Sequence, residues 1–207
     1  MIHPDTGMVF VSDEIGLGVV ATASLPRGTI VWAQDRFDVE IPLQTYRELD
    51  AAHRAVVDRY AHLDAGKNRI LCWDAGRYVN HDCRPSLRGV GSTMMIATRD
   101  LAPGDAITCD YAECNLDETL RCSCGAPTCR EYIRREDLVT FAPAWDEEVR
   151  FLCQAARQVP QPLWPYLRRP DETRALIWGY RTIPSFAHIY GEGLDAMPPS
   201  VITRTSL

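Results

Sequence analysis

The sequence predicts a mainly β fold of small sheets with α insertions, followed by a C-terminal helical extension. Three observations support this fold class: short β-prone segments between turns, one helical segment among them, and a helical tail that follows a cysteine cluster. With 207 residues, the chain is long enough for one compact domain and an appendage.

The first third of the sequence contains alternating strand and turn signals. Residues 9–11, 19–21 and 30–32 are β-prone, and turns that contain Gly, Asp or Pro, such as residues 25–28, separate them. Apolar residues then recur at steps of three and four between residues 43 and 63. We therefore expect one helical insertion over this segment, between short strands.

Short strands return after the insertion. We expect strands over residues 70–73, 93–98 and 106–109, with a turn that contains Pro and Gly at residues 102–105. The sequence lacks βαβ units and lacks a glycine-rich loop between a strand and a helix. This pattern argues against a Rossmann-type nucleotide-binding fold.

The tail becomes helical again after residue 129, around residues 145–159 and 172–180, and prolines interrupt it. Apolar residues of the first segment form one helical stripe, which is too small for an independent core. We expect this stripe to pack on the cysteine-rich segment or to form a homodimer surface. The last residues, about fifteen of them, have no such pattern and are expected to be loosely ordered.

Composition is that of an ordinary globular protein, with 46% hydrophobic and 24% charged residues. No apolar run approaches the roughly 18 residues that span a membrane, and the N-terminus lacks a secretory signal pattern. We expect a soluble, non-secreted protein of the cytoplasm, or of the nucleus if the source is eukaryotic. The net charge of −6 favours a basic protein partner and disfavours direct nucleic-acid binding.

Cys122, Cys124 and Cys129 form a C-x-C-x4-C cluster, the most specific metal signal in the chain. Three thiolates this close suit structural Zn²⁺, which prefers tetrahedral sulfur ligands, better than they suit unliganded buried cysteines. A fourth ligand must come from elsewhere in the chain. On chemistry alone, the candidates are Cys83, Cys114 and Cys72.

Four segments, in this order, resemble the SET-domain family of protein-lysine methyltransferases. They are G-L-G-V at residues 16–19, R-Y-V-N-H-D-C at 77–83, G-D-A-I-T-C-D-Y at 104–111, and the cysteine cluster with its following Arg at 122–130. The last segment is similar to the family's post-SET zinc motif. The resemblance covers residues 8–133, which we expect to be a SET domain with its post-SET motif at 122–130. Residues 141–207 are expected to be a helical extension and tail.

This resemblance implies a fold of small sheets with a pseudoknot-like core, and an enzyme that transfers methyl groups from S-adenosylmethionine to a lysine amine. It also implies that Cys83 is the fourth zinc ligand, and that Tyr111 is the catalytic residue, with its hydroxyl directed at the reacting nitrogen. The residues implied to bind the cofactor belong to the first two segments: Gly16, Leu17, Gly18, Arg77, Tyr78, Asn80 and His81.

Two departures from the family pattern keep other interpretations open. Cys109 stands where the family usually has Phe or Tyr, and the segment around Trp32 lacks the Tyr-x-Gly-Glu often found there. A catalytically silent SET-like module that binds a peptide is one alternative, and a zinc-ribbon interaction protein is another. The latter leaves the three other segments unexplained. The expected partner of the enzyme is a basic, lysine-bearing protein or peptide.

Overall fold

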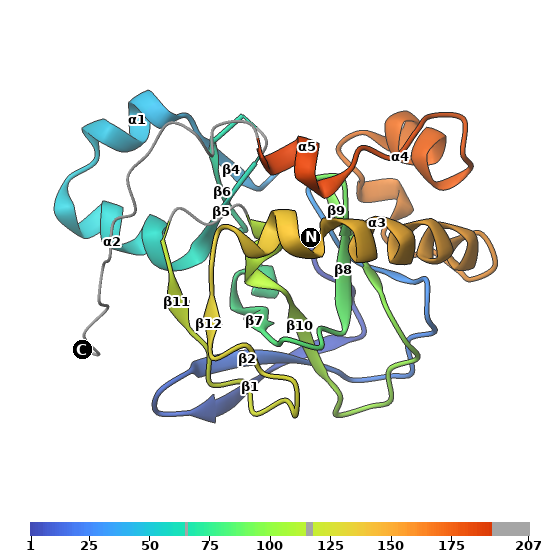
Figure 1. The fold of residues 1–207 in the computed structure, drawn as a ribbon, viewed down its shortest axis with the longest axis horizontal. Helices are drawn as coiled ribbons and strands as arrows, with labels where there is room; N and C mark the ends of the chain where they lie inside the picture. The colour runs from blue at the N-terminus through green and yellow to red at the C-terminus, as the bar shows by residue number, and fades with distance from the viewer. Residues whose placement is uncertain (65, 115–117, 192–207) are drawn as a thin grey trace.

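The computed structural model describes residues 1–64, 66–114 and 118–191 as short strands and helices around a mixed core (Figure 1). A first sheet has the order β1-β2-β10-β7, and a second has the order β3-β9-β8. A third sheet has the order β4-β6-β5, and β11 pairs with β12. The strands are β1 (Thr6–Ser12), β2 (Gly16–Ala21), β3 (Ile30–Ala33), β4 (Val39–Ile41), β5 (Ala61–Leu63), β6 (Arg69–Leu71), β7 (Asn80–His81), β8 (Leu87–Val90), β9 (Met94–Ala97), β10 (Ala106–Cys109), β11 (Leu120–Arg121) and β12 (Tyr132–Ile133). The mainly β fold class with helical insertions and a C-terminal helical extension is confirmed.

One parallel strand pair brings two of the sequence motifs together. Strand β7 pairs with β10, with Thr108 opposite Asn80 and Cys109 opposite His81. Strand β10 also pairs with β2 on its other side, through Ile107 and Val19. As a result, the G-L-G segment, the N-H segment and the end of β10 before Tyr111 lie in one sheet.

The helical insertion consists of α1 (Leu43–Glu48) and α2 (Ala51–Tyr60). The Asp50 side chain accepts the backbone N–H of His53 at 2.9 Å, which caps the start of α2. The expected helix through residue 63 is wrong at its end, because Ala61–Leu63 forms β5 and pairs with β6. The apolar residue at Leu63 fits a helix and a strand equally well, and the pairing of this segment with β6 makes it a strand.

Helix α3 (Asp137–Ala156) covers the second sheet (Figure 1). Its residues Trp145, Val149 and Leu152 share one core with Ile30 of β3 and Ile96 of β9. The shorter helices α4 (Pro170–Ile177) and α5 (Phe186–Gly191) follow, and Ile177 and Phe186 belong to the same core. The extension thus packs against the strands, while a domain boundary between residues 133 and 141 stays a prediction.

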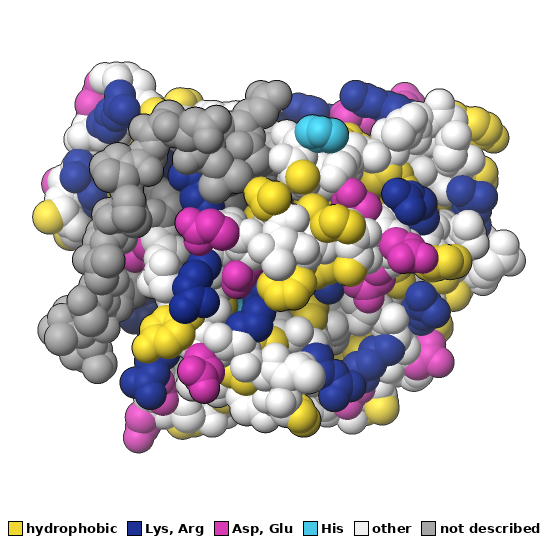
Figure 2. All heavy atoms as spheres, viewed as in Figure 1, with side chains coloured by type: hydrophobic (Ala, Val, Ile, Leu, Met, Phe, Trp, Pro, Cys, Tyr) yellow, Lys and Arg dark blue, Asp and Glu magenta, His cyan; other side chains and the backbone are white. Residues whose placement is uncertain are grey.

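Three short 3₁₀ helices complete the described chain: η1 (Ala75–Tyr78), η2 (Tyr111–Cys114) and η3 (Trp164–Tyr166). Among the described residues, no helix combines the length and the apolarity needed to cross a membrane. On the face that carries α3, acidic and basic side chains are intermingled (Figure 2). The expectation of loose order at the C-terminal end falls on residues 192–207, outside the described residues.

Candidate active site and metal centre

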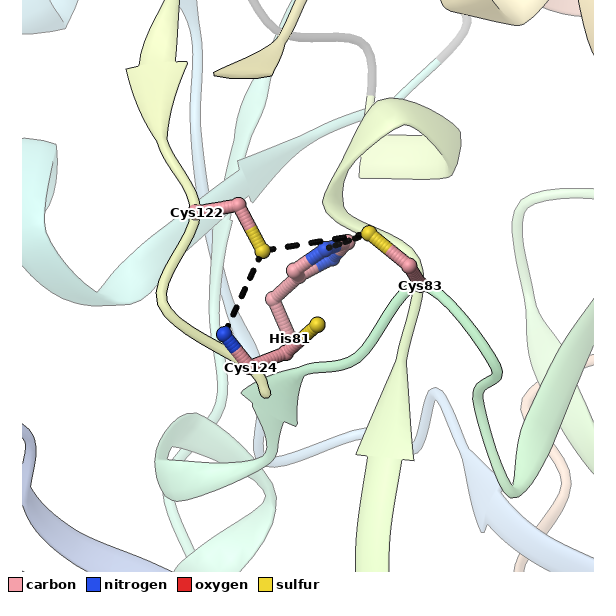
Figure 3. A group of neighbouring side chains, drawn as sticks. All are labelled: His81, Cys83, Cys122 and Cys124. Carbon is pink, nitrogen blue, oxygen red and sulfur yellow. Dashed lines mark hydrogen bonds between the residues drawn. The ribbon is translucent and has the colours of Figure 1, made fainter. Parts of the chain in front are cut away.

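Three cysteines and a histidine meet between β7 and the segment that follows β11. One ligand atom each of His81, Cys83, Cys122 and Cys124 lies within 4.8 Å of the others (Figure 3). The Sγ atoms of Cys83 and Cys122 are 3.8 Å apart. Sulfur atoms at about 2.3 Å from a tetrahedral Zn²⁺ are themselves roughly 3.8 Å apart, so this spacing suits a zinc site.

Cys129 lies next to this cluster. Its thiol interacts with the thiols of Cys122 and Cys124, and its Sγ accepts the backbone N–H of Glu131 at 3.4 Å. Of the three candidates for the fourth ligand, Cys83 is in the cluster, whereas Cys114 and Cys72 both line the cavity described below. Three of the four predicted zinc ligands therefore belong to the cluster, which has His81 as its fourth member, and Cys129 lies beside it.

The imidazole of His81 connects the cysteine cluster to Tyr111. Its Nδ1 accepts the backbone N–H of Tyr111 at 3.1 Å, and its Nε2 lies 3.3 Å from Sγ of Cys83. Burial lowers the pKa of His81, so the ring is neutral near pH 7. A neutral imidazole whose Nδ1 accepts a hydrogen bond carries its own hydrogen on Nε2. In this tautomer Nε2 is a donor toward Cys83.

Arg130, directly after the cysteine cluster, ties it to the strand end before Tyr111. Its backbone N–H donates to Sγ of Cys83 at 3.4 Å, and its guanidinium donates to Asp110 at 2.6 Å. Burial lowers the pKa of Arg130, but the Asp110 carboxylate outweighs this effect and raises it. Folding of the cysteine-rich segment and placement of Tyr111 are therefore coupled through this ion pair.

Tyr111, the predicted catalytic residue, lies at the edge of a cavity of about 380 Å³. Its hydroxyl donates to the backbone carbonyl of Val79 at 3.2 Å, and Val79 lines the same cavity. Its ring lies 5.4 Å from the ring of His81. Two oxygen atoms, the Tyr111 hydroxyl and the Val79 carbonyl, thus meet at this part of the cavity.

The G-L-G segment lies beside Asn80. The Asn80 side-chain amide donates to the carbonyl of Leu17 at 3.0 Å. A Cβ at Gly18 would lie 2.7 Å from the Val11 side chain and 3.0 Å from the Asn80 side chain, so a larger residue there would displace one or both of them. Gly16 has a φ of +81°, in the left-handed region that glycine adopts without strain. Gly16, Leu17, Gly18 and Asn80 thus form one continuous edge next to His81.

Arg77 and Tyr78, the remaining predicted cofactor residues, end η1 and face different surroundings. Arg77 lines the cavity with Tyr111. Tyr78 packs against the core formed by β2 and β10, and its ring meets the ring of Tyr60 edge to face at 5.6 Å. In this structure Arg77 therefore faces the cavity, while Tyr78 supports its wall through Tyr60, which lines the cavity.

The cavity walls come from elements far apart in the sequence. Trp32 of β3 and His62 of β5 pack edge to face at 5.4 Å, and both line the cavity. Burial lowers the pKa of His62 to about 4, so this part of the wall is uncharged at neutral pH. Cys109 and Phe186 line the cavity as well. The neighbouring Cys114 thiol and burial raise the pKa of Cys109, which stays a neutral thiol.

Glu113 is a site residue that the sequence reasoning missed. It lies two residues after Tyr111, lines the cavity, and accepts hydrogen bonds from the Arg88 guanidinium and from the backbone N–H of Gly89. Burial raises the pKa of Glu113 to about 7, although the Arg88 charge acts in the opposite direction. An acidic residue close to the predicted catalytic Tyr was a signal that could have found it, whereas Phe186 has no comparable local signal.

Part of the chain that carries these residues matches a known family. Residues 16–112 match the SET domain family. The chain contains a SET domain. The matched segment includes Tyr111, Cys83 and all seven predicted cofactor residues. The other three cysteines of the cluster and the helical extension lie after the end of the match.

Curated relatives of this SET domain are much longer proteins. An H3 lysine-36-specific histone-lysine N-methyltransferase of Schizosaccharomyces pombe is 28% identical over 145 residues, which cover 60% of this chain and 17% of the relative. An H3 lysine-4-specific enzyme of the same yeast is 34% identical over 84 residues, which cover 37% of this chain and 9% of the relative. Trithorax of Drosophila melanogaster is 33% identical over 67 residues, 29% of this chain and 2% of the relative. The chain spans less than a fifth of the length of each.

Two solved structures have weak similarity to this chain. The methyltransferase domain of human histone-lysine N-methyltransferase SETMAR gives a TM-score of 0.45 at 15% identity, covering 65% of this chain and 58% of that one. KRYPTONITE in complex with mCHG DNA and SAH gives a TM-score of 0.44 at 21% identity, covering 61% and 28%.

Proposed function

We propose that this SET domain transfers a methyl group from S-adenosylmethionine to the side-chain amine of a lysine in a protein or peptide. The observation that carries the proposal is the meeting of the Tyr111 hydroxyl and the Val79 carbonyl at the cavity, beside the Asn80–His81 strand. The SET family match and the names of the relatives agree with this chemistry.

The residues present fit the proposed cofactor. S-adenosylmethionine, when bound, supplies a methyl group on a cationic sulfonium, and neutral oxygen atoms suit such a cation. The Tyr111 hydroxyl and the Val79 carbonyl provide two. At Gly16, a Cβ would meet only the Arg59 side chain at 4.0 Å, so the backbone there is accessible. We propose Gly16, Leu17, Gly18, Asn80 and His81 as its principal contacts, with Arg77 and Tyr78 as flanking ones.

Tyr111 would act by orientation. Methyl transfer requires a neutral amine, since an ammonium group has no free electron pair. The Tyr111 hydroxyl, held by Val79, would fix the direction of the amine, and the cavity walls would keep water away. The hydrogen bond that the backbone N–H of Tyr111 donates to Nδ1 of His81 would be one link that holds Tyr111 in place.

We also propose that Cys83, Cys122, Cys124 and Cys129 bind one structural Zn²⁺. The thiols of Cys83, Cys122 and Cys124 lie within 4.8 Å of one another, and the Cys129 thiol interacts with those of Cys122 and Cys124. The hydrogen bond that His81 Nδ1 accepts makes its Nε2 a donor, which favours Cys129 over His81 as the fourth ligand. Burial raises the pKa of the Cys83 and Cys122 thiols, and a cation acts in the opposite direction, because coordinating thiols lose their protons. The proposed role is to hold Arg130 and, through it, Asp110 beside Tyr111.

The proposed substrate is a basic, lysine-bearing segment, since the chain carries a net charge of −6. Direct nucleic-acid binding is not part of the proposal. The relatives are named for histone H3 lysines, but this chain covers only 17% and 9% of their length. We therefore propose a lysine of a protein or peptide as the substrate and do not name a particular protein. A homodimer through the helical extension is a secondary proposal, which light scattering of the purified protein tests.

The test is a transfer assay with isotope-labelled S-adenosylmethionine, a lysate as methyl acceptor, and peptide mapping of the product. Self-methylation of lysine side chains has one target only, because Lys67 is the single lysine of the chain. Lys67→Arg is therefore a clean control. Label on acceptor lysines supports the proposal. Binding of S-adenosylmethionine without transfer to any acceptor would favour the silent SET-like module, the interpretation that Cys109 keeps open.

A further inference from the structure

A second hollow lies in the C-terminal extension, after the end of the SET match. It has a volume of about 540 Å³ and shares no lining residue with the cavity beside Tyr111. Helix α4, which lines part of it, packs beside the C-terminal half of α3 (Figure 1). Its polar and aromatic lining residues define the extension hollow: Arg157, Gln161, Trp164, Arg174, Trp178 and Tyr180.

Gln161 connects the extension hollow to the SET sheets. Its Nε2 donates to the carbonyl of Gly28 at 2.8 Å, and its Oε1 accepts the backbone N–H of Ile30 at 2.7 Å. A Cβ at Gly28 would lie 2.6 Å from the Ala155 backbone, so the chain before β3 packs directly on the end of α3. The SET core therefore holds this hollow in place, and a preformed site loses less entropy when a partner binds.

Two indoles and one phenol give the extension hollow an aromatic surface. The rings of Trp164 and Trp178 meet edge to face at 5.8 Å, and the Arg174 guanidinium lies 5.7 Å from the centre of the Trp164 ring. Trp178 and Tyr180 expose 40% and 78% of their surface, so their rings are available to a ligand. Trp, Tyr and Arg are the residue types enriched where binding energy is concentrated in protein interfaces.

The charge of this segment is opposite to that of the chain. Residues 157–181 contain five arginines and two acidic residues, a net charge of +3 in a chain of −6, so the remaining residues carry −9. Glu172, one of the two acids, pairs with Arg181 at 2.8 Å outside the hollow. Among the described residues, no carboxylate forms an ion pair with Arg157 or Arg174, which line it. Two such guanidinium groups beside aromatic rings attract an anionic group.

We propose that the extension hollow binds an acidic segment of a partner protein, with carboxylates on Arg157 and Arg174 and an apolar side chain against Trp178. Single-stranded nucleic acid also combines phosphates with bases that stack on aromatic rings. The charge of −9 on the remaining chain repels such a polyanion, whereas a short acidic segment brings few charges. The extension hollow is separate from the proposed methyl-transfer site, so this inference does not rest on the proposed function.

Fluorescence polarisation of labelled peptides with the full chain tests the proposal. The probes are three peptides with four glutamates on each side of a central leucine, phenylalanine or tryptophan, and the same peptides with glutamine in place of glutamate. We expect at least one acidic peptide to bind about tenfold more tightly than its glutamine counterpart, and to lose this advantage at about 0.5 M salt, where surface charges are screened. Equal binding of the two sets of peptides, or no binding of any acidic peptide, overturns the proposal.

Substitutions in the extension hollow locate the binding site. Arg174→Glu should weaken binding of the acidic peptide by about tenfold, equivalent to roughly 1.4 kcal/mol, and Trp178→Ala should have a similar effect. The matched controls are Arg47→Glu on α1, with the same change of charge, and Phe10→Ala on β1; both change exposed side chains and should bind as wild type. Arg174 is exposed, so Arg174→Glu decides the matter even where Trp178→Ala fails to fold. Unchanged affinity in folded Arg174→Glu contradicts binding at this hollow.

The same substitution separates the acidic segment from other occupants. A fluorescent oligonucleotide of twelve thymidines that binds more tightly than every acidic peptide, and loses affinity in Arg174→Glu, would assign the hollow to nucleic acid. Self-association that light scattering detects in the wild type and that Arg174→Glu abolishes would assign it to a second copy of this chain. Either result overturns the acidic partner.

Discussion

The cysteine cluster and the cavity both lie beside Tyr111, but their residues come from the sequence in different ways. The cluster comes from two short segments, 81–83 and 122–129, and the cysteine spacing of the second predicts a metal site. The cavity is assembled from single residues of many elements, such as Trp32, His62 and Phe186. Chemistry that needs fixed ligand geometry is therefore encoded locally, while the shape of the cavity depends on how the whole chain packs.

The strongest test of this contrast removes the packing that builds the cavity. Ending the chain after residue 141 deletes Trp145, Val149 and Leu152, which are buried against Ile30 and Ile96. Loss of each large buried side chain costs about 2–5 kcal/mol, and the total stability of a domain is about 5–15 kcal/mol. We expect the truncated protein to show no cooperative thermal unfolding by circular dichroism. A melting temperature equal to that of the full chain would contradict the shared core.

The second largest effect is expected on zinc binding by the cysteine cluster. Cys122→Ser should lower bound zinc from one equivalent per chain to a small fraction, because one of four ligands is lost. Elemental analysis of protein purified without chelator measures this. Cys153→Ala, a buried cysteine of α3 outside the cluster, should keep its zinc. Cys129→Ala should lose zinc while His81→Ala retains it, and the opposite pattern would make His81 the fourth ligand.

A smaller effect is expected at the proposed cofactor edge. Asn80→Ala removes the hydrogen bond to the Leu17 carbonyl and leaves that oxygen without this donor. Affinity for S-adenosylmethionine should fall by about 1–3 kcal/mol, measured by calorimetry. Gln44→Ala, an exposed amide on α1, is the control. Equal cofactor affinity in Asn80→Ala and wild type would remove Asn80 from the site.

The smallest effect is a change in the product rather than in the rate. Cys109 leaves more room in the cavity than an aromatic ring would, so the wild-type protein is expected to add more than one methyl group to a lysine. Cys109→Phe should shift the product toward monomethyl-lysine, as measured by mass spectrometry after exhaustive reaction. Strict monomethylation by the wild type, unchanged in Cys109→Phe, would show that another residue limits the product.

Sequence patterns predicted the local parts of the fold well and the assembled parts poorly. Strands β2, β3 and β10 carry runs of apolar and β-branched residues, so propensity and turn signals identify them. Strand β8 was missed because Arg88 and Gly89 interrupt its apolar pattern, and their burial becomes clear only with Glu113 and Glu148 in place. The two-residue strands β11 and β12 exist through their pairing and have no periodicity to detect.

The same division holds for the site. Asn80, His81, Cys83 and Tyr111 lie in motifs that can be read directly from the chain. The side-chain link from Cys83 through His81 to the backbone of Tyr111 depends on the parallel pairing of β7 with β10, which residue spacing does not specify. The place of Phe186 on the cavity wall could not be predicted from the sequence at all, because it depends on the path of the chain through α3, α4 and α5.

Tyr111→Phe tests the central claim most directly, because it removes one hydroxyl and almost no volume. Removing a single hydrogen-bonding group that acts in the transition state typically slows an enzyme by about 10²–10³-fold. We expect methyl transfer to a lysine peptide by Tyr111→Phe to fall by about this factor, while calorimetry gives nearly the wild-type Kd for S-adenosylmethionine. Transfer at the wild-type rate by Tyr111→Phe would contradict the proposed role of the Tyr111 hydroxyl in lysine methylation.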